Sequence, residues 1–276
     1  MRYITLNDDV RIPQLGFGVW QIPDAEAYES VAAALEAGYR HVDTAAAYEN
    51  ESGVGRAVKG SGVPREEVFL TTKLWNGDHG YDATLRAFDK SLERLGTDYV
   101  DLYLIHWPVP QRNLYVESWR ALEKIAADGR ARSIGVSNFT PETLDRLLKE
   151  GTTPPAINQI ELHPYFPQPA MRDHHRKHGI ATEAWSPLGQ GGDLLGEPLL
   201  ARLGGEYGKT PAQVVIRWHL QLGNVVIPKS ATPSRIRENF EVFDFELTAE
   251  EVAEIAGLGR AGGRIGPDPA VFNYTG

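Results

Sequence analysis

The sequence predicts an α/β fold of the (β/α)8, or TIM-barrel, class, and two features of its pattern lead to this prediction. Short runs rich in Val, Ile and Leu recur along the 276 residues, as expected of parallel strands that are buried on both faces. Segments with helical periodicity lie between these runs; Ala25–Ala37, for example, places Tyr28, Val31 and Leu35 on one stripe. Strands that alternate with helices form either a closed barrel or a doubly wound open sheet.

A glycine-rich phosphate loop after the first strand would favour the open sheet, and the sequence lacks one. The nearest match to Gly-x-Gly-x-x-Gly is Gly53-Val54-Gly55, which has no third glycine and begins a helix after polar sequence. We interpret it as structural. With eight strands, and a helix near Ser234–Val242 after the last of them, closure into a barrel is the economical arrangement.

The predicted strands are short, and the first is the weakest. They span Leu15–Gly18, Arg40–Asp43, Val68–Lys73, Val100–His106, Ser133–Ser137, Ile157–Glu161, Ile180–Trp185 and Asn224–Pro228. Helices between them are expected to end at glycines that adopt the left-handed conformation. These glycines are Gly38, Gly60, Gly96, Gly129, Gly151, Gly179 and Gly223. Helix starts are marked by capping residues at Thr140-Pro141, Thr210–Gln213 and Thr248–Glu251.

Segments outside the repeat are expected at the two ends of the barrel. Residues 1–12 read as a hairpin that closes the base, with Tyr3–Leu6 and Val10–Ile12 as its two strands. Residues 257–276 are rich in Gly and Pro and are expected to form a tail near the active-site mouth. Because no linker or charge run divides the chain, we expect residues 1–276 to form one domain.

The composition excludes several kinds of chemistry. The chain has 28 basic and 37 acidic residues, a net charge of −9, and no cysteine. Disulfides, thiolate catalysis and Cys-ligated zinc are therefore excluded, and the acidic balance argues against a nucleic-acid partner. The N-terminus is too polar for a signal peptide, and no apolar run approaches the roughly 20 residues of a membrane span. We expect a cytoplasmic monomer with no membrane partner.

Four ionisable side chains are predicted to meet at the carboxyl ends of neighbouring strands, where barrel enzymes place their active sites. Asp43, Lys73 and His106 end three consecutive strands, and Tyr48 lies in the loop after the first of these. Adjacent strands are about 4.8 Å apart, so these side chains can converge. Each alone has a structural alternative: a turn cap for Asp43, packing for Tyr48 or a core position for His106. Lys73 is costly to bury without a partner, and Asp43 supplies one.

This combination suits the reduction of a carbonyl group. A free tyrosine has a pKa near 10, and an adjacent ammonium is expected to lower it. We therefore interpret Tyr48 as the proton donor, with Lys73 beside it and Asp43 holding the lysine. His106 would position the carbonyl oxygen by hydrogen bonding.

A groove for a dinucleotide with a 2′-phosphate is predicted along the later strands. Lys229 and Ser230 follow the last strand, with Arg235 and Arg237 shortly after them, at a place where barrels frequently bind phosphate. Arg237 could instead belong to a solvated basic turn. Ser137, Asn138 and Gln159 offer hydroxyl and amide groups for a carboxamide, and Trp185 could stack on a flat ring.

Several motifs resemble those of the aldo-keto reductases over essentially the whole chain. They are GYRHVDTAAAY (38–48), LYLIHWP (102–108), GVSNF (135–139), NQIELHP (158–164) and IPKS (227–230). The likeness is closest to the bacterial 2,5-diketo-D-gluconate reductase branch. It implies NADPH as hydride donor to aldehydes and ketones and the catalytic tetrad Asp43, Tyr48, Lys73 and His106.

The resemblance also implies roles in cofactor and substrate binding. Ser186 and Leu188 would line the pyrophosphate, and Glu238 and Asn239 would lie near the adenine. Many members stack the nicotinamide on tyrosine, where this chain has Trp185, as in the diketogluconate branch. The substrate mouth is expected to be lined by Trp20, Trp75, Trp107 and Gln190, with Phe272 and Tyr274 of the tail closing over it.

Three other interpretations compete with this one. Lys73 could form a Schiff base in an aldolase-type barrel, although the groups around Lys229 would then lack a purpose. A barrel of this kind could also act as a non-catalytic NADPH-sensing subunit. A metal could bind His174 and His178, with His175 nearby, but all three lie on a polar stretch that we interpret as surface, so we expect no metal.

Overall fold

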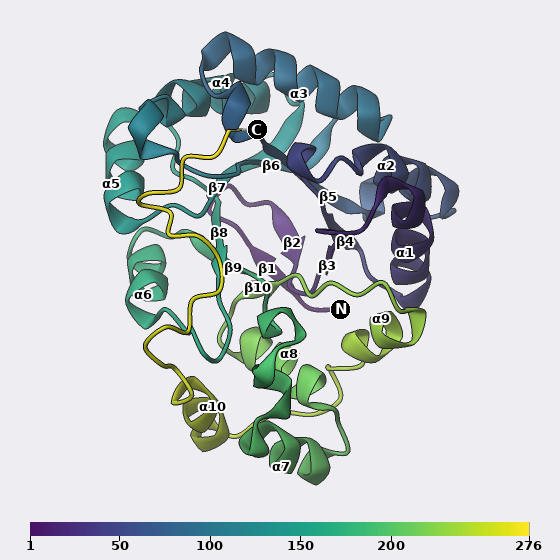
Figure 1. Ribbon diagram of the computed structural model, residues 1–276. Coiled ribbons are helices and arrows are strands. Elements are labelled where there is room, and N and C mark those ends of the chain that lie inside the picture. Colours follow the sequence, from purple (N-terminus) through teal and green to yellow (C-terminus); the bar gives the residue numbers. More distant parts are fainter. Residues whose placement is uncertain (276) are drawn as a thin grey trace.

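Eight parallel strands form one ring in chain order in the computed structural model, which describes residues 1–275 (Figure 1). They are β3 (Phe17–Gly18), β4 (His41–Asp43), β5 (Phe69–Leu74), β6 (Val100–Ile105), β7 (Ala131–Ser137), β8 (Ile157–Glu161), β9 (Ala181–Trp185) and β10 (Val225–Val226). A parallel bridge between Leu15 and Val226 joins the first strand to the last, and Gly16 N donates to Val226 O at 2.9 Å. The predicted (β/α)8 barrel is confirmed.

Helices surround the ring, and three of them (α5, α8 and α10) begin where the capping residues predicted. They are α1 (Asp24–Ala37), α2 (Glu51–Gly60), α3 (Tyr81–Leu95), α4 (Tyr115–Ala127), α5 (Pro141–Glu150), α6 (Pro169–Lys177), α7 (Pro198–Tyr207), α8 (Pro211–Gln221), α9 (Pro233–Phe240) and α10 (Ala249–Ala256). The side chains of Thr140, Thr210 and Thr248 each accept a hydrogen bond from the third backbone N–H of the helix that follows. Within the described residues, none of the helices is both long and apolar enough for a membrane span.

Two of the seven predicted helix-ending glycines do not adopt the left-handed conformation. Gly38, Gly96, Gly129, Gly179 and Gly223 do, with φ between 64° and 107°. Gly60 is instead the last residue of α2, and Gly62 takes the positive φ of 73°. Gly151 is extended, with φ of −83°, and a Cβ there would lie 2.8 Å from the Trp119 ring. Gly151 thus provides room for packing rather than freedom of the backbone.

Gly53 and Gly55 have the structural role that the sequence suggested. They lie on the face of α2 that packs against α1 and the end of α3. A Cβ on Gly53 would collide with the carbonyl oxygen of Asp24, and one on Gly55 with that of Leu95. These glycines therefore let helices approach closely and do not bind phosphate.

The base of the barrel is closed by the predicted hairpin, formed by β1 (Tyr3–Thr5) and β2 (Arg11–Pro13). Ile12 is fully buried and belongs to an apolar cluster with Phe69, Ile157 and Val225, the first residues of β5, β8 and β10. Because these residues begin their strands, the hairpin plugs the end of the barrel opposite the strand termini that carry the predicted site.

The C-terminal segment after α10 crosses the barrel and ends beside β6 and α4, as the yellow trace in Figure 1 shows. Glu161, which ends β8, accepts hydrogen bonds from the backbone N–H groups of Ile265 (2.6 Å) and Gly266 (2.8 Å). Further along, Trp75 Nε1 donates to Thr275 O at 3.0 Å. The predicted tail is therefore fixed across the strand termini at several points.

The prediction that His175 lies on the surface is wrong. Its side chain is fully buried between α6 and the barrel, where its ring nitrogens lie 2.9 Å from Asn158 Nδ2 and 2.8 Å from Thr182 Oγ1. The polar sequence of α6 hid this position, because a helix on a barrel turns one stripe inward even when that stripe carries a polar group. Burial lowers the pKa of His175 to about 3, which keeps the ring neutral.

We expect His175→Ala to lower the free energy of unfolding by about 2–4 kcal/mol, because it leaves a cavity and two buried polar groups without their partner. Urea denaturation measures this change. The matched control is Lys177→Ala, an exposed position two residues further on, for which we expect a change within about 0.5 kcal/mol. Equal effects of the two substitutions would contradict the buried role of His175.

Candidate active site

The four predicted catalytic side chains converge at the carboxyl ends of β4, β5 and β6. Lys73 Nζ donates to Asp43 Oδ1 at 2.6 Å and to the carbonyl oxygen of Thr44 at 2.8 Å. It also lies 3.4 Å from Tyr48 Oη. The ring of His106 packs edge-on against that of Tyr48, with centroids 5.6 Å apart. The neighbouring strand ends thus bring a carboxylate, an ammonium group, a phenol and an imidazole together, as the sequence predicted.

The loop that carries Tyr48 is held in place by hydrogen bonds of Asn50, which is fully buried. Thr44 Oγ1 donates to Asn50 Oδ1 at 2.7 Å, and Asn50 Nδ2 donates to the carbonyl oxygens of Val19 (2.9 Å) and Ile22 (2.8 Å). All polar atoms of this amide are therefore used to join β4, its loop and the segment after β3. Tyr48 itself ends the short 3-10 turn η1 (Ala46–Tyr48), which presents its side chain to Lys73.

The net shift in the pKa of Tyr48 is opposite to the lowering expected from the sequence. Burial raises the pKa of the Tyr48 phenol above its ordinary value, and the opposing effect of the Lys73 ammonium does not fully offset this. Burial alone would lower the pKa of Lys73, but the carboxylate of Asp43 and Tyr48 raise it overall. Tyr48 therefore stays protonated at neutral pH, beside a lysine that stays charged.

The imidazole of His106 is neutral. Burial, followed by the nearby charge of Lys73, holds its pKa well below its ordinary value. Its Nδ1 is buried and has no hydrogen-bond partner among the described residues. A neutral ring beside Tyr48 can orient a carbonyl oxygen without adding a second positive charge to the site.

The predicted carboxamide-binding residues lie next to this tetrad and are hydrogen-bonded to it. Asn138 Nδ2 donates to the carbonyl oxygen of His106 at 2.9 Å and to Ser137 Oγ at 3.0 Å. Gln159 Nε2 donates to Asp43 Oδ2 at 2.8 Å. No described residue donates to Gln159 Oε1, so this oxygen can accept a hydrogen bond from a ligand.

Trp185 ends β9 beside these amides, and its Nε1 donates to Asn138 Oδ1 at 2.8 Å. The following loop turns sharply, because Ser186 has a positive φ of 47°. Leu188 packs against the barrel core in the same loop. Trp185 is therefore placed for stacking on a ring that reaches Asn138 and Gln159.

The segment after β10 offers cations without protein partners. Lys229 and Arg235 are exposed, and neither forms an ion pair with any described residue. Ser230 Oγ accepts from Thr232 N at 3.1 Å. The unpaired cations fit an anionic group such as a phosphate. Glu238 instead turns toward α8, where it accepts from Thr210 Oγ1 at 2.8 Å, and Asn239 is buried.

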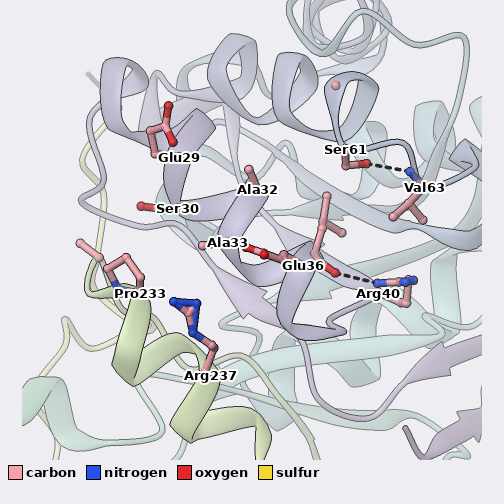
Figure 2. A pocket seen from close by; sticks show the side chains of 13 residues that line it. Glu29, Ser30, Ala32, Ala33, Glu36, Arg40, Ser61, Val63, Pro233 and Arg237 are labelled. Atoms are coloured by element: carbon pink, nitrogen blue, oxygen red, sulfur yellow. Dashed lines mark hydrogen bonds between the residues drawn. The ribbon is translucent and has the colours of Figure 1, made fainter.

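A surface hollow of about 700 Å³ lies on the outside of the barrel, between α1, the end of α2 and the start of α9. Figure 2 shows Arg237 and Pro233 on one side of it and Glu29, Glu36 and Arg40 on the other. None of its lining residues belongs to the tetrad or to the predicted cofactor groove. It is thus separate from the candidate active site.

Aromatic side chains from the rim and from the tail surround the tetrad. The Trp75 ring lies 5.5 Å from that of His106 and 6.1 Å from that of Tyr274. Trp107 packs against Phe272 with ring centroids 4.4 Å apart. The tail therefore covers the mouth through the two residues that the sequence singled out.

The other two predicted substrate residues follow the carboxyl ends of β3 and β9. Trp20 follows β3 and is 40% exposed, with no aromatic partner among the described residues. Gln190 is exposed in the loop after β9 and lies 3.4 Å from Ser186 Oγ. Both are free to contact a ligand, and their roles stay predictions.

Sequence reasoning missed the burial of several acidic side chains, among them Glu51 and Glu183. Glu51 accepts from Thr72 Oγ1 at 2.5 Å and pairs with Arg94, which ties α2 to β5 and α3. Glu183 lies inside the barrel and accepts from Gln159 Nε2 at 2.9 Å. A glutamate in a short apolar strand was the only signal for Glu183, and it was read as part of the strand.

His174 and His178 lie on the outer side of the barrel, between α5 and α6. Their rings are 4.7 Å apart, and His174 Nε2 is 3.0 Å from Asp145 Oδ1. These three groups have the types and spacing that could hold a metal ion. They do not reach the strand ends, and the expectation that the reaction uses no metal stays a prediction.

Comparison with known proteins identifies the family of this chain. Residues 14–260 match the family model of the Aldo/keto reductase family. An aldo-keto reductase of Mycolicibacterium smegmatis is 61% identical over 99% of this chain and 98% of its own length. The methylglyoxal reductase DkgA of Escherichia coli is 52% identical over 98% of this chain and 97% of its own.

Among solved structures, a variant of the protein Gox0644 in complex with NADPH superposes with a TM-score of 0.95. The two sequences are 47% identical, and the match covers 99% of each chain. The match extends over the barrel, the loops that carry the tetrad and nearly all of the tail. The chain belongs to the aldo/keto reductase family.

Proposed function

We propose that this protein reduces aldehydes and ketones to alcohols with NADPH, and that Tyr48 donates the proton. Small dicarbonyls and keto-sugars of the 2,5-diketo-D-gluconate type are the expected substrates. The observation that carries this proposal is the buried chain from Asp43 through Lys73 to Tyr48, with His106 beside it. Family membership and the NADPH-bound neighbour support the cofactor.

The residues of the chain divide the work of carbonyl reduction. Bound NADPH supplies the hydride to the carbonyl carbon. His106 holds the carbonyl oxygen close to Tyr48, and Tyr48 Oη transfers its proton to that oxygen as negative charge develops there. The phenolate that remains is stabilised by the Lys73 ammonium, which Asp43 and the Thr44 carbonyl keep in place. A phenol that is protonated before the reaction is the form that this step needs.

Cofactor binding follows from the groups along β7 to β10. Ser137, Asn138 and Gln159 would hold the carboxamide, and Trp185 would stack on the nicotinamide ring. Ser186 and Leu188 would line the pyrophosphate, with Lys229, Ser230 and Arg235 around the 2′-phosphate. Glu238 and Asn239 would shape the adenine end from α9, although their side chains already have protein contacts.

The aromatic residues around the opening of the active site would determine which substrates the protein accepts. Trp75 and Trp107, with the tail residues Phe272 and Tyr274, present flat apolar walls, and Trp20 and Gln190 would lie at the edge. Such walls would contact the carbonyl end of a compact substrate, and the hydroxyl groups of a keto-sugar would face the polar rim. The name of the methylglyoxal reductase relative supports a small dicarbonyl as the first substrate to assay. We further propose that one barrel domain, acting as a cytoplasmic monomer, carries the whole activity.

The structure disfavours Lys73 as a Schiff-base nucleophile. A lysine attacks a carbonyl only as the neutral amine, yet Asp43 and Tyr48 raise the pKa of Lys73. Steady oxidation of NADPH in the presence of methylglyoxal would also exclude a purely cofactor-sensing role.

The test of the proposal is the choice of cofactor. We expect methylglyoxal reduction with a kcat/KM for NADPH that exceeds that for NADH by roughly 10–100-fold, because charged hydrogen bonds to the 2′-phosphate contribute about 1.5–3 kcal/mol. Lys229→Gln and Arg235→Gln should each lower kcat/KM for NADPH by about tenfold or more and leave the value for NADH within about twofold.

The matched control is Arg237→Gln on the same helix, because Arg237 lines the separate hollow. It should leave both values unchanged. Equal use of NADPH and NADH by the unmodified protein, or a loss in the control as large as in Arg235→Gln, would contradict the phosphate site.

A further inference from the structure

Glu183 is a buried carboxyl group without a cation of its own. It lies in the middle of β9, its side chain is 0% exposed, and it forms no ion pair with any lysine or arginine among the described residues. The nearby ammonium of Lys73 is already bound by Asp43. Burying a carboxyl group without a paired cation costs free energy. The position therefore invites an explanation in terms of a ligand.

The hydrogen bonds of Glu183 lead directly to the proposed nicotinamide site. Gln159 is its register partner on β8, and Gln159 Nε2 donates both to Glu183 Oε2 (2.9 Å) and to Asp43 Oδ2 (2.8 Å). The second oxygen, Glu183 Oε1, is buried and has no hydrogen-bond partner in the described part of the chain. Oε2 thus holds the Gln159 amide that would bind the carboxamide, and Oε1 accepts no hydrogen bond from the described residues.

The strand geometry places this carboxyl group below the proposed ring. Side chains at positions i and i+2 of a strand point to the same side, so Glu183 and Trp185 share a face of β9. Two residues of a strand rise about 6.6 Å, so the carboxyl group and a ring stacked on Trp185 would be separated by a distance on this order. At that spacing, and at the effective dielectric constant of about 20 typical of proteins, unit charges interact strongly enough to change affinity roughly tenfold or more.

The nicotinamide ring is neutral in NADPH and carries a positive charge in NADP⁺. We propose that Glu183 makes the site sensitive to the redox state of the cofactor, because its carboxylate supplies the counter-charge for the oxidised ring. This inference rests on the proposed function, which places the ring against Trp185 and the carboxamide on Gln159. It assigns Glu183 an electrostatic positioning role without contact to the substrate.

The charge on Glu183 is expected to depend on pH. Burial, and then the charge of Asp43, raise the pKa of Glu183 from 4.5 to about 8. The other ionisable groups that face it titrate outside this range: burial lowers the pKa of His41 on β4 to about 3, and the pKa values of Lys73 and Tyr48 are raised above their ordinary values near 10. NADP⁺ should therefore bind more tightly as pH rises toward 8, and NADPH should not.

The experiment measures the dissociation constants of NADP⁺ and NADPH by fluorescence titration from pH 6.5 to 9.5. The ratio of the two constants removes the titration of the 2′-phosphate, which both cofactors share. In the unmodified protein, Kd for NADP⁺ divided by Kd for NADPH should fall by roughly tenfold with rising pH and level off above about pH 8. In Glu183→Gln, which keeps an acceptor for Gln159 but cannot ionise, the ratio should stay flat.

Two further variants keep the test decisive. Glu183→Leu should give the same flat ratio if Glu183→Gln does not fold. Glu51→Gln removes another buried carboxyl group, one that Arg94 already neutralises, and should keep the pH dependence of the unmodified protein. A flat ratio in the unmodified protein, or an unchanged pH dependence in Glu183→Gln, would overturn the inference. Failure of both cofactors to bind the unmodified protein would instead overturn the proposed function.

Discussion

Tyr48→Phe is expected to lower kcat for methylglyoxal reduction by about 10²–10⁴-fold, the usual contribution of a positioned general acid. The substitution removes only the hydroxyl group that lies 3.4 Å from Lys73 Nζ, and it keeps the ring that packs against His106. The dissociation constant of NADPH should stay within about twofold, because no proposed cofactor contact involves the Tyr48 hydroxyl. Steady-state assays at 340 nm and fluorescence titration measure the two quantities.

Tyr103→Phe is the matched control for this substitution. Tyr103 is fully buried in β6, and its hydroxyl has no hydrogen-bond partner in the described part of the chain. Removing that hydroxyl should leave kcat within about twofold. A Tyr48→Phe enzyme that retains more than a tenth of the turnover would show that another group donates the proton.

Lys73→Met is expected to lower both the stability of the protein and its turnover. The free energy of unfolding should fall by about 3–5 kcal/mol, because Asp43 would be left as a buried carboxylate without its cation. Turnover should fall by about 10²-fold or more, because the phenolate of Tyr48 would lose its neighbouring ammonium. Urea denaturation and steady-state kinetics separate the two.

The double variant Asp43→Asn/Lys73→Met distinguishes stability from catalysis. It removes both charges, so part of the lost stability should return, whereas turnover should stay low. Lys59→Met, at an exposed position on α2, is the control for the loss of a lysine elsewhere. Recovery of turnover in the double variant would contradict the role of Lys73 in stabilising the phenolate.

The meeting of the catalytic residues was predictable from the fold, because the carboxyl ends of all strands in a barrel lie at the same edge. Asp43, Lys73 and His106 could be brought together from the sequence alone, since each ends an apolar run and the runs are consecutive. The closing hairpin and the tail could also be predicted, because turn residues and glycine content mark them. The left-handed glycines were predictable only in part, because Gly60 is still helical at the end of α2 and Gly151 is extended after α5.

Other features depend on packing that a local pattern does not reveal. His175 lies in a polar stretch, but the position of α6 on the barrel turns it inward. Asn50 holds the loop of Tyr48 through partners from β4 and from the segment after β3, which are far apart in sequence. Glu183 is recognisable only when its partner Gln159 is seen on the next strand.

The direction of the pKa of Tyr48 was wrong for a related reason. The neighbouring ammonium of Lys73 was visible from the strand ends, and it does lower the pKa of the phenol. The degree of burial was not visible, and it raises the pKa by more. The same burial surrounds Lys73 and Asp43, so the pair polarises the site without making Tyr48 ionise at neutral pH.

A single-turnover measurement decides whether Tyr48 gives its proton to the carbonyl oxygen during hydride transfer. Enzyme already loaded with NADPH is mixed with excess methylglyoxal in a stopped-flow instrument, and the loss of NADPH absorbance is followed. We predict that Tyr48→Phe oxidises its bound NADPH at least about 100-fold more slowly than the unmodified enzyme. Equal rates of this first turnover would contradict the account, because proton donation by Tyr48 would then play no part in the chemical step.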